Sequence, residues 1–242
     1  MAGVSDLILE VAGRRVTVSV RRSPLARAVS LRVDPVRGVV LVLPPRARLG
    51  DAQGFLAAHQ GWLARRLERL PTPLPLIAGA SVPIGGRDLP IRHCPEARRG
   101  AWIEGDCLCV SGDADHLPRR VGDFLKAEAR RRLVTRTHQL AARVERKPGR
   151  ITLKDTVSRW GSCSSQGHIA LSWRLVMAPD WVADYVVGHE VAHLVEMNHS
   201  SAFWAVVRSL GLDERAARAW LKSNGAQLHR YRVEGEGFPY QE

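Results

Sequence analysis

Residues 6–43 have the pattern of strands, and in two stretches hydrophobic and polar side chains alternate as in strands that bury one face. Val16, Val18 and Val20 are separated by Thr17 and Ser19. Residues 29–33 repeat the alternation, and residues 39–43 form a continuous apolar run that two prolines end. The pattern therefore predicts a sheet at the start of the chain.

The period then changes to that of a helix. Apolar residues recur at helical spacing over residues 48–70, which predicts one helix there. Residues 76–110 return to strands and turns, with a hairpin expected at Gly105-Asp106. Residues 117–147 predict a long helix that Pro148-Gly149 ends.

The last part of the pattern is a hairpin that leads into a buried helix. Between Ile151 and Val176 the alternation predicts a hairpin, whose second strand covers Ile169–Leu175. The segment Trp181–Val195 is apolar almost all round its axis, so this helix should be buried. Asp180 is a suitable N-cap for it.

These elements predict an α+β fold in two regions. We expect residues 1–115 to form a β-rich region with one helix, and residues 116–242 to form an α+β domain around the buried helix. Prolines at positions 71, 73 and 75 predict a short stiff linker inside the first region.

The buried helix carries the chemistry. His189-Glu190-Val191-Ala192-His193 has the form H-E-x-x-H. Residues four apart share a helix face, so His189 and His193 can reach one Zn²⁺. Glu190 is turned aside from the metal but can reach a water in the open position, which is where a zinc hydrolase needs its general base.

Two residues compete for the third ligand position. His199 lies beyond the end of the helix, on a segment that can turn back toward the first two ligands. Glu196 lies three residues after His193 on much the same face. A tetrahedral site closes more easily from a returning segment, so we favour His199.

The charge balance leaves two interpretations open. The chain has a formal net charge of +12, and only four of its 36 basic residues are lysines. Such an arginine bias is compatible with genome composition alone. It is also compatible with an anionic partner such as nucleic acid, a nucleotide or an acidic peptide.

The cysteines and the hydropathy indicate a compartment. Four cysteines with no C-x-x-C pair form neither a disulfide scaffold nor a second zinc site. We see no signal peptide at the N-terminus and no apolar run long enough to span a membrane. We therefore expect a reduced, cytoplasmic protein with no membrane partner.

At this point several motifs resemble those of the YgjP-like metallopeptidase family, a zincin-type bacterial group related in general plan to SprT-like proteases. The resemblance covers nearly the whole chain and is specific in the C-terminal half. Its motifs are Arg159-Trp160-Gly161-Ser162-Cys163, Ser172-Trp173-Arg174-Leu175, Tyr185 to Leu194, Asn198-His199-Ser200 and Phe203-Trp204.

This resemblance implies a zincin-like domain with zinc held by His189, His193 and His199, and Glu190 as base. One departure is Ser172, where the family pattern has Asn before Trp-Arg-Leu. That change leaves the metal site intact but puts any inherited role of the amide in doubt.

Peptide hydrolysis is the leading hypothesis, and two other classes stay open. The strand Ile169–Leu175 could bind an extended substrate at a sheet edge. Arg159 and Arg174 are candidates for stabilising an oxyanion, although a structural role is favoured for each, and Cys163 is a candidate inhibitory ligand. The alternatives are a metal-dependent nucleotide pyrophosphohydrolase, and a non-catalytic nucleic-acid-binding module with a structural zinc.

Overall fold

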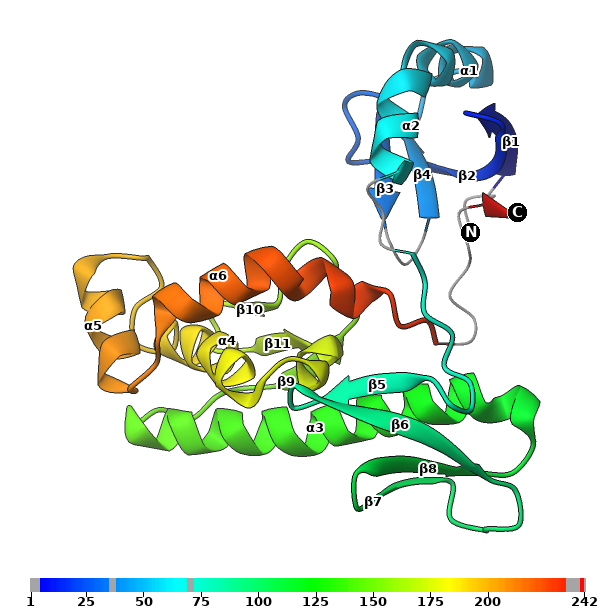
Figure 1. The fold of residues 1–242 in the computed structure, drawn as a ribbon. Coiled ribbons are helices and arrows are strands. Elements are labelled where there is room, and N and C mark those ends of the chain that lie inside the picture. Colours follow the sequence, from blue (N-terminus) through cyan, green and yellow to red (C-terminus); the bar gives the residue numbers. More distant parts are fainter. Residues whose placement is uncertain (1–4, 35–37, 69–71, 234–239, 242) are drawn as a thin grey trace. The chain divides into compact units, whose positions relative to one another are not determined.

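The computed structural model describes the chain except for residues 1–4, 35–37, 69–71, 234–239 and 242. The chain divides into two compact units, Met1–Thr72 with Gly235–Glu242 and Pro73–Glu234, each drawn in Figure 1. We expected a boundary between residues 115 and 116. The observed division comes earlier because the strands of residues 81–111 share one hydrophobic core with the helices that follow.

The first unit is a sheet covered by two short helices. Its strand order is β1-β2-β4-β3, with β12 also paired to β2. The β2–β4 pair is parallel, and the other pairs are antiparallel. The elements are β1 (Ser5–Val11), β2 (Arg14–Arg22), β3 (Ser30–Asp34), β4 (Gly38–Leu43), α1 (Leu49–Ala58), α2 (Gln60–Glu68) and β12 (Tyr240–Gln241).

The single helix expected over residues 48–70 is interrupted at His59. The His59 ring stacks on Phe55 with centroids 4.0 Å apart, and its Nδ1 lies 2.8 Å from the Phe55 carbonyl oxygen. The backbone at His59 leaves the helical region, with φ −108° and ψ 9°. The break leaves Leu56 and Leu63 both buried against the sheet.

The second unit begins with a four-stranded sheet of order β5-β6-β8-β7. Its strands are β5 (Ser81–Ile84), β6 (Arg87–Cys94), β7 (Ala101–Glu104) and β8 (Cys107–Ser111). The β7–β8 hairpin turns at Gly105, whose φ of 59° suits glycine, as the sequence predicts. The one-turn helix η1 (Ala114–His116) then leads into α3 (Leu117–Arg143), whose buried side chains join the core of these strands.

A three-stranded sheet and the remaining helices complete this unit. The strand order is β10-β11-β9, from β9 (Ile151–Lys154), β10 (Gly161–Cys163) and β11 (Ile169–Ser172). Helix α4 (Asp180–Ala192) contacts both α3 and α6, as Figure 1 shows. The other elements are η2 (Trp173–Met177), α5 (Ser201–Ser209), α6 (Glu214–Asn224) and η3 (Gly225–His229).

Two expectations about the hairpin before α4 are wrong. The strand predicted over Ile169–Leu175 ends at Ser172, and residues 173–177 form the 3₁₀ helix η2 instead. β11 is also the central strand of its sheet, with β10 on one side and β9 on the other. An extended substrate therefore cannot pair with it, and the open edge nearest α4 belongs to β10.

In the part of the chain that the structure describes, no helix has both the length and the apolar character needed to cross a membrane.

Candidate metal centre

Helix α4 positions the first part of the centre. It begins after Pro179, so Asp180 is its first residue rather than its N-cap, and His193 is the C-cap residue. The imidazoles of His189 and His193 lie on one face with ring centroids 5.1 Å apart. Nine residues of this helix are buried, because α3, α6 and η2 all pack against it.

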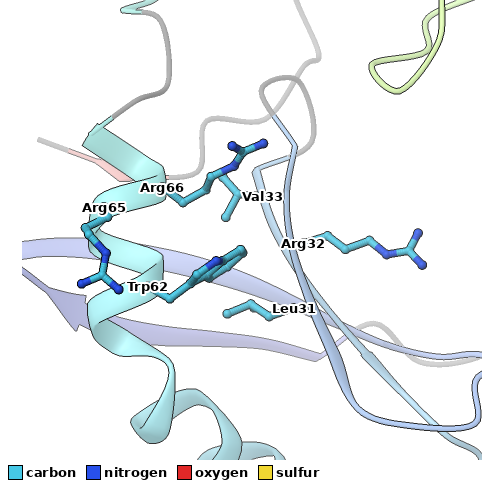
Figure 2. A pocket seen from close by; sticks show the side chains of 6 residues that line it. All are labelled: Leu31, Arg32, Val33, Trp62, Arg65 and Arg66. Carbon is cyan, nitrogen blue, oxygen red and sulfur yellow. The ribbon is translucent and has the colours of Figure 1, made fainter.

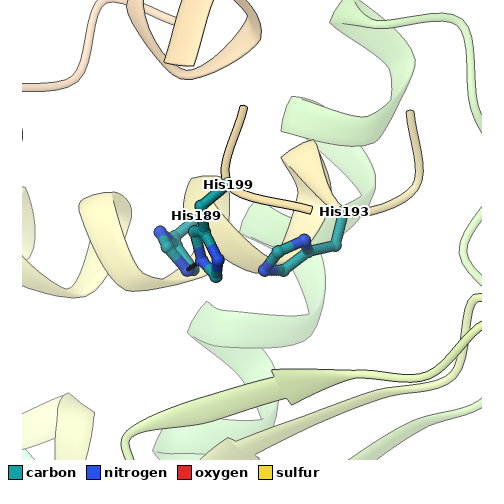
Figure 3. A group of neighbouring side chains, drawn as sticks. All are labelled: His189, His193 and His199. Carbon is teal, nitrogen blue, oxygen red and sulfur yellow. Dashed lines mark hydrogen bonds between the residues drawn. The ribbon is translucent and has the colours of Figure 1, made fainter. Parts of the chain in front are cut away.

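The chain then turns back and adds a third imidazole. The Asn198 side chain accepts a hydrogen bond from the Ser200 N–H at 3.0 Å, and the Ser200 hydroxyl caps α5 by accepting from the Phe203 N–H. Between them, His199 brings its Nε2 to 3.1 Å from the Nε2 of His189. Figure 3 shows the three side chains converging.

One ring nitrogen from each of these histidines lies within 4.8 Å of the others, and Glu196 is not in the group. Glu196 has a different part in the arrangement. Its backbone carbonyl oxygen lies 3.0 Å from the Nδ1 of His193. A proton on that Nδ1 would be donated to the carbonyl, which fixes the tautomer and leaves the Nε2 lone pair free for a metal.

Phe203 forms the wall behind the three rings. Its ring centroid lies 5.0 Å from that of His189, 4.6 Å from His193 and 4.7 Å from His199. The residue is completely buried. It therefore limits the rotation of the imidazoles and excludes water from that side.

Burial also keeps the imidazoles of His189 and His193 neutral. Burial, assisted by the neighbouring His193 and His199, lowers the pKa of His189 to about 4. Burial also lowers the pKa of His193. Neutral imidazole is the form that binds a metal, so both rings are ready ligands near neutral pH. Within the described residues, the Nδ1 of His189 is buried without a hydrogen bond.

Glu190 follows His189 on α4, and its side chain packs against Gly161 of β10. It is only 6% exposed, and a Cβ placed on Gly161 would lie 2.5 Å from its Oε1. Burial raises the pKa of Glu190 to about 7, although the positive charge of Arg159 acts to lower it. Burial, with the nearby Glu190, raises the pKa of Cys163 to about 11, so this thiol is a poor metal ligand near neutral pH.

Arg174, one of the two oxyanion candidates, and Gly188 of α4 have structural roles. Arg174 is fully buried and donates two hydrogen bonds to Asp155, at 2.7 and 2.9 Å, and others to the carbonyls of Leu228 and Tyr231. It is therefore not placed to stabilise an oxyanion. Gly188 faces the core rather than the metal, because an added Cβ would lie 2.1 Å from the Cδ1 of Leu212.

Sequence reasoning missed the contact between Gly161 and Glu190. A glycine in a short polar strand carries no pattern of its own, and the partner is 29 positions away in the printed sequence. Arg159, the other proposed oxyanion residue, is exposed and precedes β10, close enough to act electrostatically on Glu190.

The model of the YgjP-like, metallopeptidase domain family matches residues 27–224. The chain belongs to the YgjP-like metallopeptidase family. Membership makes it a metal-dependent peptidase in general terms, and the three histidines of this YgjP-like chain are a group that could hold the metal.

Comparison with solved structures adds one weak likeness. The crystal structure of the metallopeptidase zymogen of Pyrococcus abyssi abylysin is 22% identical, with a TM-score of 0.35. The match covers 42% of the YgjP-like chain and 99% of the abylysin chain. No curated protein matches this YgjP-like chain.

Proposed function

We propose that the chain is a zinc-dependent peptidase in which His189, His193 and His199 hold the ion and Glu190 is the general base. The observation that carries the proposal is the convergence of three ring nitrogens within 4.8 Å, next to a buried carboxylate. Family membership supports the peptidase, and the choice of metal rests on the donor set.

The residues fit zinc in number, type and spacing. Three imidazoles and one open position are a common catalytic zinc set. Two nitrogens bound tetrahedrally at 2.0–2.1 Å would be roughly 3.4 Å apart. The Nε2 atoms of His189 and His199 are 3.1 Å apart, and all three ring nitrogens lie within 4.8 Å of one another, so small shifts would bring them onto one ion.

A bound zinc ion would supply Lewis acidity, which favours deprotonation of water and polarises a carbonyl group. Glu190 would take the proton from the attacking water and return it to the nitrogen of the leaving amine. Its buried position keeps bulk water from competing for that proton. Gly161 lets β10 approach the carboxylate closely and hold it in place.

The substrate would bind along β10. The outer edge of this strand pairs with no other strand in the described residues, and β10 packs on α4. An extended peptide that pairs with Gly161–Cys163 would pass beside Glu190. This replaces the role expected for the strand at residues 169–175.

The two alternative functions, a nucleotide pyrophosphohydrolase and a nucleic-acid-binding module, have less support. Neither the family nor the geometry of the centre supports a nucleotide pyrophosphohydrolase. A structural zinc in a nucleic-acid-binding module would leave the buried carboxylate of Glu190 without a role.

The Glu190→Gln variant, assayed for cleavage of a casein-like polypeptide, tests the proposal. Loss of a general base typically lowers the rate by about 10²–10⁴-fold. We expect that loss with unchanged zinc content and melting temperature, because the imidazoles are untouched. Glu96→Gln, at an exposed residue, makes the same chemical change and should keep full activity. Full activity in Glu190→Gln would remove Glu190 from the mechanism.

A further inference from the structure

The first unit contains a pocket of about 380 Å³ between α2 and β3, which we call the arginine pocket. Its lining, shown in Figure 2, consists of Leu31, Arg32, Val33, Trp62, Arg65 and Arg66. No part of the metal centre contributes to it, since all six residues belong to the first unit. The arginine pocket is therefore a separate feature that the proposed chemistry does not use.

The charge of the arginine pocket is uncompensated. Among the described residues, its lining contains three arginines and no acidic residue. Within the described residues, Arg32, Arg65 and Arg66 form no ion pair or hydrogen bond through their side chains. Residues 1–72 hold 12 arginines and five acidic residues, a net charge of +7. This setting favours a negatively charged ligand.

The arginine pocket also has an apolar side. Trp62 is 40% exposed, which leaves much of a large ring accessible to solvent. Figure 2 shows Leu31 and Val33 on the side of Trp62, while Arg32 points away from it. A ligand that lies along β3 would meet apolar surface on one face and a guanidinium on the other.

The strand that borders the arginine pocket has an open edge. β3 pairs with β4 on one side and is the last strand in the sheet order. On its other side, none of the described residues pairs with it. An edge strand presents backbone donors and acceptors in a row, and an extended peptide can pair with them.

We propose that the arginine pocket binds an extended, acidic segment of polypeptide, which adds to β3 as a further strand. Its carboxylates would face Arg65 and Arg66, and an apolar side chain would pack on Trp62. The proposal rests on the proposed function in one respect: it identifies the segment as part of a peptidase substrate. The open backbone edge favours a peptide over single-stranded nucleic acid, which is usually bound by several stacked aromatic residues rather than one.

Binding can be measured separately from cleavage. The full chain carrying Glu190→Gln would be titrated against a fluorescent peptide of about eight residues in which Glu and Val alternate in pairs, so that the face toward α2 carries both types; this length covers a strand of five residues. We expect binding that weakens with salt, because the arginines are exposed. This titration measures binding without cleavage. If the peptide does not bind, the proposed zinc peptidase mechanism is unaffected. If the chain proves to have no peptidase activity, binding of the peptide to the arginine pocket can still be observed.

Two comparisons locate the binding. The Arg65→Ala/Arg66→Ala variant should bind about tenfold more weakly, and Trp62→Ala about tenfold or more. Arg27→Ala/Arg46→Ala removes the same charge from exposed positions of the same unit outside the arginine pocket, and should bind normally. A peptide with alternate backbone nitrogens methylated keeps its charges but loses the donors, so it should also bind about tenfold more weakly if it pairs with β3.

The other outcomes overturn the proposal. Equal binding of the methylated peptide would exclude strand addition. Equal weakening by the Arg27 and Arg46 substitutions would mean general charge attraction. Tighter binding of an oligothymidylate of similar length, lost in the same pocket variants, would assign the arginine pocket to nucleic acid. No binding of the acidic peptide at low salt would exclude this ligand class.

Discussion

Replacing Gly161 with alanine should lower peptidase activity while leaving the metal content unchanged. The added Cβ would lie 2.5 Å from the Oε1 of Glu190, 2.7 Å from its Cγ and 2.8 Å from its Cδ. Carbon atoms in contact are about 3.5 Å apart, so the carboxylate must move by about 0.7 Å. β10 is held by its pairing with β11, so the flexible Glu190 side chain is the part that gives way.

The size of the effect follows from that displacement. Catalytic groups must be held within about 0.5 Å of their productive position, and a misplacement of about 1 Å can cost about 10²-fold in rate. We therefore expect kcat/KM to fall by about 10–10²-fold. Overpacking also costs about 1–3 kcal/mol of stability. Zinc content should not change, because the methyl group reaches Glu190 and not the imidazoles.

The assay compares peptide cleavage, zinc content and urea unfolding of Gly161→Ala with those of Gly122→Ala. The Cβ of an alanine at position 122 in α3 would lie 2.2 Å from the Cγ1 of Val233. This control adds the same methyl group to the same unit and should lose stability with its activity retained. Full activity of Gly161→Ala would refute the contact between β10 and the base, and loss of zinc together with activity would mean that the centre itself had been disturbed.

Two further predictions concern stability. Arg174→Leu removes the two hydrogen bonds that Asp155 accepts from Arg174 and should cost about 3–5 kcal/mol in urea unfolding; a variant of normal stability and no activity would instead place Arg174 in the chemistry. Hydrogen bonds and charge from Arg131 and Arg132 lower the pKa of Glu128 from 4.5 to about 2. The stabilisation that these ion pairs give the fold is therefore present above pH 4.5 and is lost as the pH falls toward 2. Because the ion pairs are partly exposed, Glu128→Gln should cost only about 1 kcal/mol of unfolding free energy at pH 7 and nothing near pH 2, and a difference that stayed constant over this pH range would contradict the assignment.

Prediction from the sequence succeeded for elements that bury only one face, because their hydrophobic residues recur with a regular spacing. β2 alternates buried and partly buried positions as expected, and α3 shows its apolar stripe. It failed for η2, whose five residues are all buried. A segment buried on every side has no period, so its conformation cannot be recognised from hydrophobicity.

The division into units was missed for a different reason. The prolines from position 71 onward indicate a boundary, but the strands of residues 76–110 look like a continuation of the earlier ones. Their buried side chains pack against α3, and the hydrophobic pattern of a strand does not show which distant segment it packs against. The histidines of the centre could be proposed from spacing alone, whereas Gly161 could not, because its importance comes from a contact between β10 and α4.

The most direct test of the account is the zinc content of the purified chain, its His199→Ala variant and its Glu196→Ala variant, measured by elemental analysis. The wild type should contain one zinc per chain. The His199→Ala variant should lose most of that zinc. Glu196→Ala should keep it, because Glu196 contributes only its backbone carbonyl to His193. Full zinc in His199→Ala together with loss in Glu196→Ala would contradict the proposed centre.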